Sequence, residues 1–74
     1  MDHKSISTRI QECANIKNQL KKMGIYENKL VTKHMNNYIH NSTSCNVKIP
    51  LGDKTFIEMC LRDKHQSGIQ MIKL

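Results

Sequence analysis

The apolar residues change their spacing part-way along the chain, and this change limits the folds that the chain can adopt. Between Ile6 and Ile39 they recur every three or four residues, as on one face of a helix. From Val47 onward they alternate with polar residues, as in a strand that buries one face. The sequence therefore predicts an α+β fold, in which an antiparallel two-helix hairpin over residues 5–40 precedes a β-rich part over residues 46–74.

The first predicted helix covers residues 5–23. Ser5 or Ser7 is suited to the N-cap, and Gly24 is suited to the left-handed position that ends a helix. Arg9 lies inside the apolar arc, so we expect its long side chain to reach solvent from the first turns or to contact a partner. The apolar positions share about 140° of arc on a helical wheel. They are Ile6, Ile10, Cys13, Ile16, Leu20 and Met23.

The second predicted helix covers residues 27–40 and has one apolar and one polar face. Because only residues 24–26 separate the two helices, we expect them to be antiparallel neighbours. Residues 41–44 have the composition of a loop. The apolar face consists of Leu30, Val31, Met35, Tyr38 and Ile39. The polar face consists of Lys29, Lys33, Asn36 and Asn37.

Strands are expected after the helices, as a small antiparallel β-hairpin or a three-stranded meander. Residues 47–51 alternate and contain Pro50, which indicates an edge strand. Gly52 and Asp53 suit a two-residue type II′ turn, after which residues 54–61 return as the paired strand. Residues 63–68 have the character of a loop, and residues 69–74 of a closing strand.

A helix over residues 55–66 is the alternative for the same segment. Thr55 and Glu58 fit a capping box, Gly68 fits a C-cap, and four apolar residues share one helical face. The hairpin is favoured because both strand faces and the turn agree. In either form the chain is one domain, and its predicted core includes Ile10, Leu20, Leu30, Met35 and Ile49.

The size of the chain bears on its function. With 74 residues it buries only roughly 60–65% of its unfolded surface, so its stability is marginal and self-association into a homo-oligomer would add to it. A concave, water-excluding catalytic pocket is hard to build on such a core. The serines, cysteines, histidines and carboxylates match no catalytic spacing, and no glycine-rich phosphate loop is present. We therefore expect a non-enzymatic protein without a cofactor.

Two histidines and two cysteines in the β-rich part make up a possible zinc ligand set, His40, Cys45, Cys60 and His65. A turn at Gly52 and Asp53 would place Cys45 opposite Cys60. However, the usual zinc motifs place two ligands of the same kind two to four residues apart, and neither half does here. Buried, reduced thiols are the favoured interpretation and a disulfide is a further alternative, so no metal site is predicted.

Lysines provide the main functional signal. The chain has 12 Lys and Arg against 6 Asp and Glu, a formal charge of +6. Folding about Gly24 would gather lysines from the end of the first helix and the start of the second. This lysine tip consists of Lys17, Lys21, Lys22, Lys29 and Lys33. It predicts sequence-independent contacts with the phosphates of nucleic acid, or with an acidic protein surface. The alternative is a solvated, solubilising lysine face.

The number of aromatic residues bears on the class of nucleic-acid partner, and the cysteines bear on the cellular compartment. Only Tyr26, Tyr38 and Phe56 are aromatic, which counts against single-strand binders that stack several bases. Three cysteines without close pairs, and no signal peptide or membrane span, predict a cytoplasmic or other reducing compartment without membrane association. Lysine, isoleucine and asparagine are abundant and have A/T-rich codons, which indicates an A/T-rich source genome, as in many phages, large DNA viruses and low-GC hosts.

Two resemblances accompany this pattern. The helical pair followed by a hairpin resembles a winged helix-turn-helix, with residues 27–33 starting the recognition helix and Gly52 and Asp53 at the wing. Residues 10–39, with a Leu-x3-Gly turn, are similar to a helical stretch of copia-type Gag proteins; no residue role is carried over from it. The second functional hypothesis is a protein-interaction module, such as an inhibitor, adaptor or assembly subunit, that docks through the hairpin edge or the apolar faces.

Overall fold

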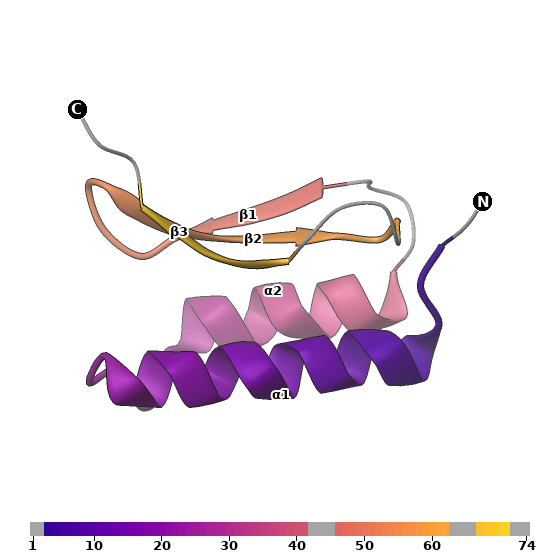
Figure 1. The fold of residues 1–74 in the computed structure, drawn as a ribbon, viewed down its shortest axis with the longest axis horizontal. Coiled ribbons are helices and arrows are strands. Elements are labelled where there is room, and N and C mark those ends of the chain that lie inside the picture. The colour runs from indigo at the N-terminus through magenta and orange to yellow at the C-terminus, as the bar shows by residue number, and fades with distance from the viewer. Residues whose placement is uncertain (1–2, 42–45, 63–66, 72–74) are drawn as a thin grey trace.

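A helical hairpin and a three-stranded antiparallel sheet form the two layers of the molecule (Figure 1). The computed structural model describes residues 3–41, 46–62 and 67–71. The helices are α1 (Ile6–Lys22) and α2 (Lys29–His40), and the strands are β1 (Asn46–Pro50), β2 (Thr55–Cys60) and β3 (Gly68–Met71). The predicted α+β class and the three-stranded meander are confirmed.

The ends of α1 follow from its sequence. The Ser5 side chain accepts a hydrogen bond from the backbone N–H of Thr8, as an N-cap does. At the other end Gly24 has a φ of 86°, and its N–H donates to the Lys21 carbonyl while the Ile25 N–H donates to the Leu20 carbonyl. This Schellman motif turns the chain back toward α2 and confirms the predicted role of Gly24.

Helix α2 begins two residues later than predicted. The Asn28 side chain accepts hydrogen bonds from the N–H groups of Leu30 and Val31, at 3.0 and 3.2 Å. Asn28 is therefore the N-cap, and Glu27 belongs to the loop between the helices. The two helices run side by side and antiparallel (Figure 1). The helices of a helix-turn-helix meet at about 90–120°, so the winged-helix resemblance does not extend to the helix arrangement.

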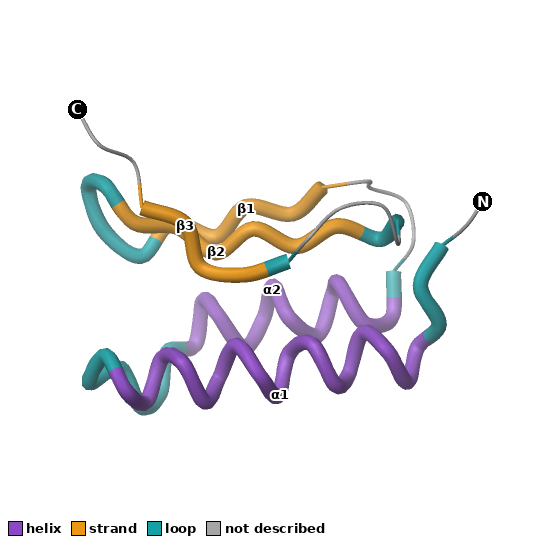
Figure 2. Tube along the Cα trace, viewed as in Figure 1, coloured by secondary structure: helices purple, strands orange, loops and turns teal. Residues whose placement is uncertain are grey.

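The central strand of the sheet is β2, and the order is β1-β2-β3 (Figure 2). Ile57 and Met59 are fully buried on the face toward the helices, where Ile57 pairs with Ile49 of β1 and Ile69 of β3. The alternative helix over residues 55–66 is therefore wrong for 55–60. Strand β1 is an edge strand, as Pro50 predicts.

The turn between β1 and β2 differs from the prediction. The Leu51 N–H donates to the Thr55 carbonyl at 2.9 Å, so Gly52, Asp53 and Lys54 form a three-residue loop. Gly52 does not have a positive φ, which a type II′ turn requires at its first position. The register consequently shifts by one residue, and Asn46 rather than Cys45 lies opposite Cys60.

The core lies between the two layers. Leu20, Met35 and Ile49 are buried as predicted, with exposed fractions of 4%, 1% and 0%. The prediction that Ile10 and Leu30 are core residues is wrong, because their side chains are 50% and 45% exposed. Each lies at the margin of its apolar arc, about 90–110° from the centre of the stripe that its helix buries.

Arg9 occupies the centre of the buried stripe of α1, between Ser5 and Cys13. It is 8% exposed, and its Nη1 donates to the Tyr38 carbonyl of α2 at 2.9 Å. The expectation that Arg9 reaches solvent is therefore wrong. Within the described chain its Nε has no hydrogen-bond partner, so the residue joins the two helices with an incompletely satisfied guanidinium.

Candidate nucleic-acid interface

The lysine tip lies at the end of the molecule where α1 turns into α2 (Figure 1). All five of its lysines are exposed. Lys17, Lys21 and Lys22 belong to the last turns of α1, and Lys29 and Lys33 belong to the first turns of α2. The β1–β2 loop lies at the same end of the molecule, above the helical turn in Figure 1.

Two adjoining hollows bring four of these lysines onto one surface. The first, of about 240 Å³, lies between the helices and is lined by Lys17 and Lys21. The second lies along the outer side of α2 and is lined by Lys29 and Lys33. Three residues line both hollows and so join them: Glu27, Asn28 and Thr32. Lys22 is exposed at the same tip but lines neither hollow.

Asparagine side chains contribute unequally to this surface. Asn28 and Asn37 line the second hollow, together with Asn36. The Asn28 carbonyl oxygen caps α2, which leaves its amide N–H groups as donors. Asn15 accepts a hydrogen bond from Gln11 on an exposed part of α1, and neither Asn15 nor Asn18 lines either of these two hollows.

The acidic side chains of the described chain leave the tip largely uncompensated. Glu12 pairs with Lys4 at 2.8 Å, and Glu58 lies 3.8 Å from Lys48 on the outer face of the sheet. None of the five tip lysines forms an ion pair within residues 3–41, 46–62 and 67–71. Glu27 is the acidic residue at the hollows themselves, and Asp53 lies in the β1–β2 loop at the same end of the molecule, so two carboxylates stand against five lysines. The positive charge is therefore available to an external anion.

Tyr26 is a member of this surface that the sequence pattern does not single out. It lies in the α1–α2 loop, lines the first hollow, and is 74% exposed. The floor of that hollow includes Leu20 and Val31, whose side chains are buried in the core. The available signal in the sequence is an aromatic residue in a short loop between lysine-rich helix ends.

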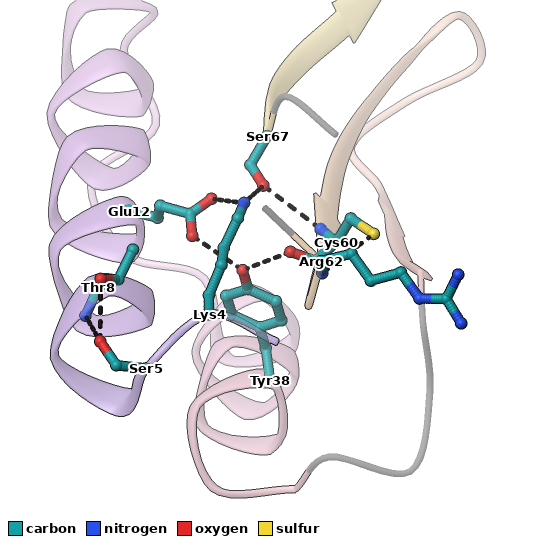
Figure 3. Close-up of polar contacts among 8 residues, drawn as sticks. All are labelled: Lys4, Ser5, Thr8, Glu12, Tyr38, Cys60, Arg62 and Ser67. Carbon is teal, nitrogen blue, oxygen red and sulfur yellow. Dashed lines mark hydrogen bonds and ion pairs between the residues drawn. The ribbon is translucent and has the colours of Figure 1, made fainter. Parts of the chain in front are cut away.

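A second cluster of polar side chains is buried at the opposite end of the helices (Figure 3). Lys4 Nζ donates to Glu12 Oε2 and to Ser67 Oγ, at 2.8 and 3.2 Å. The Tyr38 hydroxyl lies 3.0 Å from Glu12 Oε1 and 2.9 Å from the Cys60 carbonyl oxygen, so both acceptors share its one proton. Burial, and then the hydrogen bond to Glu12, raise the pKa of Tyr38 above its usual range.

This buried cluster has a structural role. It connects the N-terminal segment, both helices and the β2 and β3 strands, and its lysine and glutamate are 8% and 18% exposed. Its polar atoms are directed at one another (Figure 3). Because the pair is buried, removal of either charged partner would leave the other buried without its counter-charge, which is strongly destabilising.

The possible zinc ligands fall partly outside the described residues. Cys45 and His65 are among those not described, whereas His40 is exposed at the end of α2 and Cys60 is buried. Within the described chain no group of three or more His, Cys, Asp or Glu side chains could hold a metal ion. The one-residue register shift also removes the geometric reason for pairing Cys45 with Cys60.

Comparisons with known proteins find no matching family model, no matching curated protein and no matching solved structure. Neither helix in the described part of the chain is long and apolar enough to cross a membrane.

Proposed function

We propose that this protein is a small, non-enzymatic binding protein that associates with nucleic acid through the lysine tip. The observation that carries the proposal is the group of five exposed lysines from two helices, none of which forms an ion pair with an acidic side chain of the described chain. Four of them line two adjoining hollows, so they can contact successive phosphates of one backbone.

Such contacts are electrostatic and independent of base sequence. Each lysine that neutralises a phosphate releases a counterion, and contributes about 0.9 to the slope of log affinity against log salt on duplex DNA. Engagement of four or five lysines therefore predicts a slope of roughly −4. Asn28, Asn36 and Asn37 supply neutral hydrogen-bond donors next to the lysines, which position a backbone without adding to the salt slope.

A pair of charge-matched variants tests the proposal. Lys21→Gln/Lys33→Gln removes one tip lysine from each helix, whereas Lys48→Gln/Arg62→Gln removes two exposed cations of the β-rich part that lie outside the β1–β2 loop. Both variants lower the net charge equally. We expect the first to reduce the salt slope by about 2, alike for unrelated sequences, and the second to change it little.

The measurement is a titration with short duplex and single-stranded oligonucleotides at several salt concentrations, followed by fluorescence anisotropy. Equal loss of affinity in the two variants would mean that the overall charge, rather than the tip, is responsible. If no oligonucleotide binds at low ionic strength, the proposed function is wrong. A synthetic polyglutamate in place of the oligonucleotide tests whether an acidic protein surface is the preferred partner.

A second candidate function is a protein-interaction module, supported by two observations. Ile6 and Ile10 are 51% and 50% exposed and lie one turn apart on α1, while β1 and β3 are the edges of the sheet. Apolar side chains at this spacing, or an open strand edge, are surfaces on which another chain docks. A reducing compartment suits either function, because the two described cysteines, Cys13 and Cys60, are free thiols.

A further inference from the structure

Tyr26 is the aromatic residue of the described chain with the largest exposed surface, and it lies among the tip lysines. Of the three aromatic side chains, Tyr38 is buried at 1% exposure, and Phe56 is partly covered, with Lys48 Nζ 5.3 Å from its ring centroid. Tyr26 is 74% exposed, and its hydroxyl makes no hydrogen bond within the described chain. The core therefore does not account for its position.

The surroundings of Tyr26 combine cationic side chains with an apolar surface. Lys17 and Lys21 line the hollow from α1, and buried Leu20 and Val31 give it an apolar floor. A volume of about 240 Å³ lies below the range of about 300–1,000 Å³ for drug-sized ligands, so it suits one ring system. An exposed aromatic ring beside cations is the arrangement on which single-strand binders stack bases.

We propose that Tyr26 stacks on one unpaired nucleobase while Lys17 and Lys21 hold phosphates of the same strand. The lysine tip thus prefers single-stranded nucleic acid to duplex. This inference rests on the proposed function and names its substrate class. Glu27 also lines the hollow and disfavours a phosphate inside it, so the base occupies the hollow and the phosphates lie along α1. The bases of a duplex are stacked on each other and do not offer a free face to Tyr26.

The aromatic composition limits the strength of this preference. The sequence has few aromatic residues, which counts against a surface that stacks several bases. One stacked base changes affinity by about 5–150-fold, the range that corresponds to a single aromatic–base stack. A modest preference from one ring is therefore consistent with an aromatic-poor chain.

The test uses three oligonucleotides: an oligothymidylate of about twelve nucleotides, an abasic deoxyribose-phosphate strand of the same length and charge, and a duplex. We expect the parent protein to bind the oligothymidylate about 5–150-fold more tightly than the abasic strand, and more tightly than the duplex. Tyr26→Ala should abolish that ratio, and Tyr26→Phe should keep it. Both variants should bind the abasic strand like the parent.

Intrinsic fluorescence gives a second readout, because the chain has two tyrosines and no tryptophan. Oligothymidylate should quench the tyrosine emission, and the abasic strand should leave it unchanged. An unchanged ratio in Tyr26→Ala, or duplex binding as tight as single-strand binding, would overturn the stacking inference while the lysine tip stands. Failure of all three oligonucleotides to bind at low salt would instead overturn the proposed function.

Discussion

Leu20 and Leu30 show how the same residue type differs between the core and its margin. Leu20 is 4% exposed between the layers, and Leu30 is 45% exposed in the first turn of α2. Leu20→Ala should lower the free energy of unfolding by about 2–4 kcal/mol, because it leaves a cavity. Leu30→Ala should cost less than about 1 kcal/mol, because half of the side chain is already in water. Urea denaturation followed by circular dichroism compares the two variants. Equal losses of unfolding free energy would contradict the different burial of Leu20 and Leu30.

Cys13 predicts a loss of stability at alkaline pH. Burial raises the pKa of its thiol from 9.0 to about 11, despite the opposing effect of Lys17. The folded state therefore retains a proton that the unfolded state loses, so the stabilisation is present below pH 9 and disappears between pH 9 and 11. Between pH 9 and 11 the free energy of unfolding of Cys13→Ala should therefore fall by up to about 2 kcal/mol less than that of the parent. Denaturation midpoints at pH 8, 9, 10 and 11 measure this difference. The prediction is contradicted if the midpoints of parent and variant change with pH in the same way.

Arg9 makes a long-range polar contact that hydrophobic patterning does not predict. The spacing of α1 predicts the buried face, yet its centre holds an arginine whose guanidinium donates to the Tyr38 carbonyl. The acceptor lies 29 residues away in sequence. The contacts of Lys4 with Glu12 and Ser67 have the same character. Such pairs depend on how the layers meet, and a single sequence without its fold does not predict that.

At the scale of the elements, two glycines distinguish the two turns. Gly24 has a φ of 86° at the end of α1, whereas Gly52 does not have a positive φ, and an added Cβ meets nothing within 4 Å at either position. Gly24→Ala should destabilise the fold by about 1–2 kcal/mol, since a side chain is strained in the left-handed region. Gly52→Ala should be neutral or slightly stabilising. Thermal melting of both variants tests this, and an equal cost at Gly52 would restore the type II′ turn.

The helices and strands are predicted well from periodicity, and their connections are predicted less well. Apolar spacing, Ser5 and Gly24 locate α1, and alternation with Pro50 locates β1 at an edge. The β1–β2 loop is missed by one residue because Gly-Asp is compatible with several backbone conformations, and only the φ angles decide between them. That one residue places Asn46 opposite Cys60, in the position that the zinc hypothesis assigns to Cys45, so the hypothesis loses its geometric basis.

At the scale of the whole molecule, the lysine tip follows from the helical hairpin. Once α1 and α2 are known to be antiparallel, the lysines near their connection must lie at one end. The helical period does not predict the hollows between and beside the helices or the exposure of Tyr26, because these features depend on loop conformation and packing. The lysines of the candidate site were thus predictable, and its aromatic member was not.

Self-association is the prediction that belongs to the molecule as a whole. A 74-residue chain has a small core, and it exposes Ile6 and Ile10 on α1 and two strand edges. Association that binds only the folded chain adds to its stability, so we expect a dimer or larger assembly. Light scattering at high concentration should give at least twice the 8.6 kDa of one chain.

Ile6→Gln/Ile10→Gln keeps good helix formers on an exposed face and should shift the equilibrium toward the monomer, with little change in helix content by circular dichroism. A strict monomer in the parent would contradict self-association. An assembly that persists in the variant would assign the contact to the edges of β1 and β3, the other surface through which this fold can pair with a second copy.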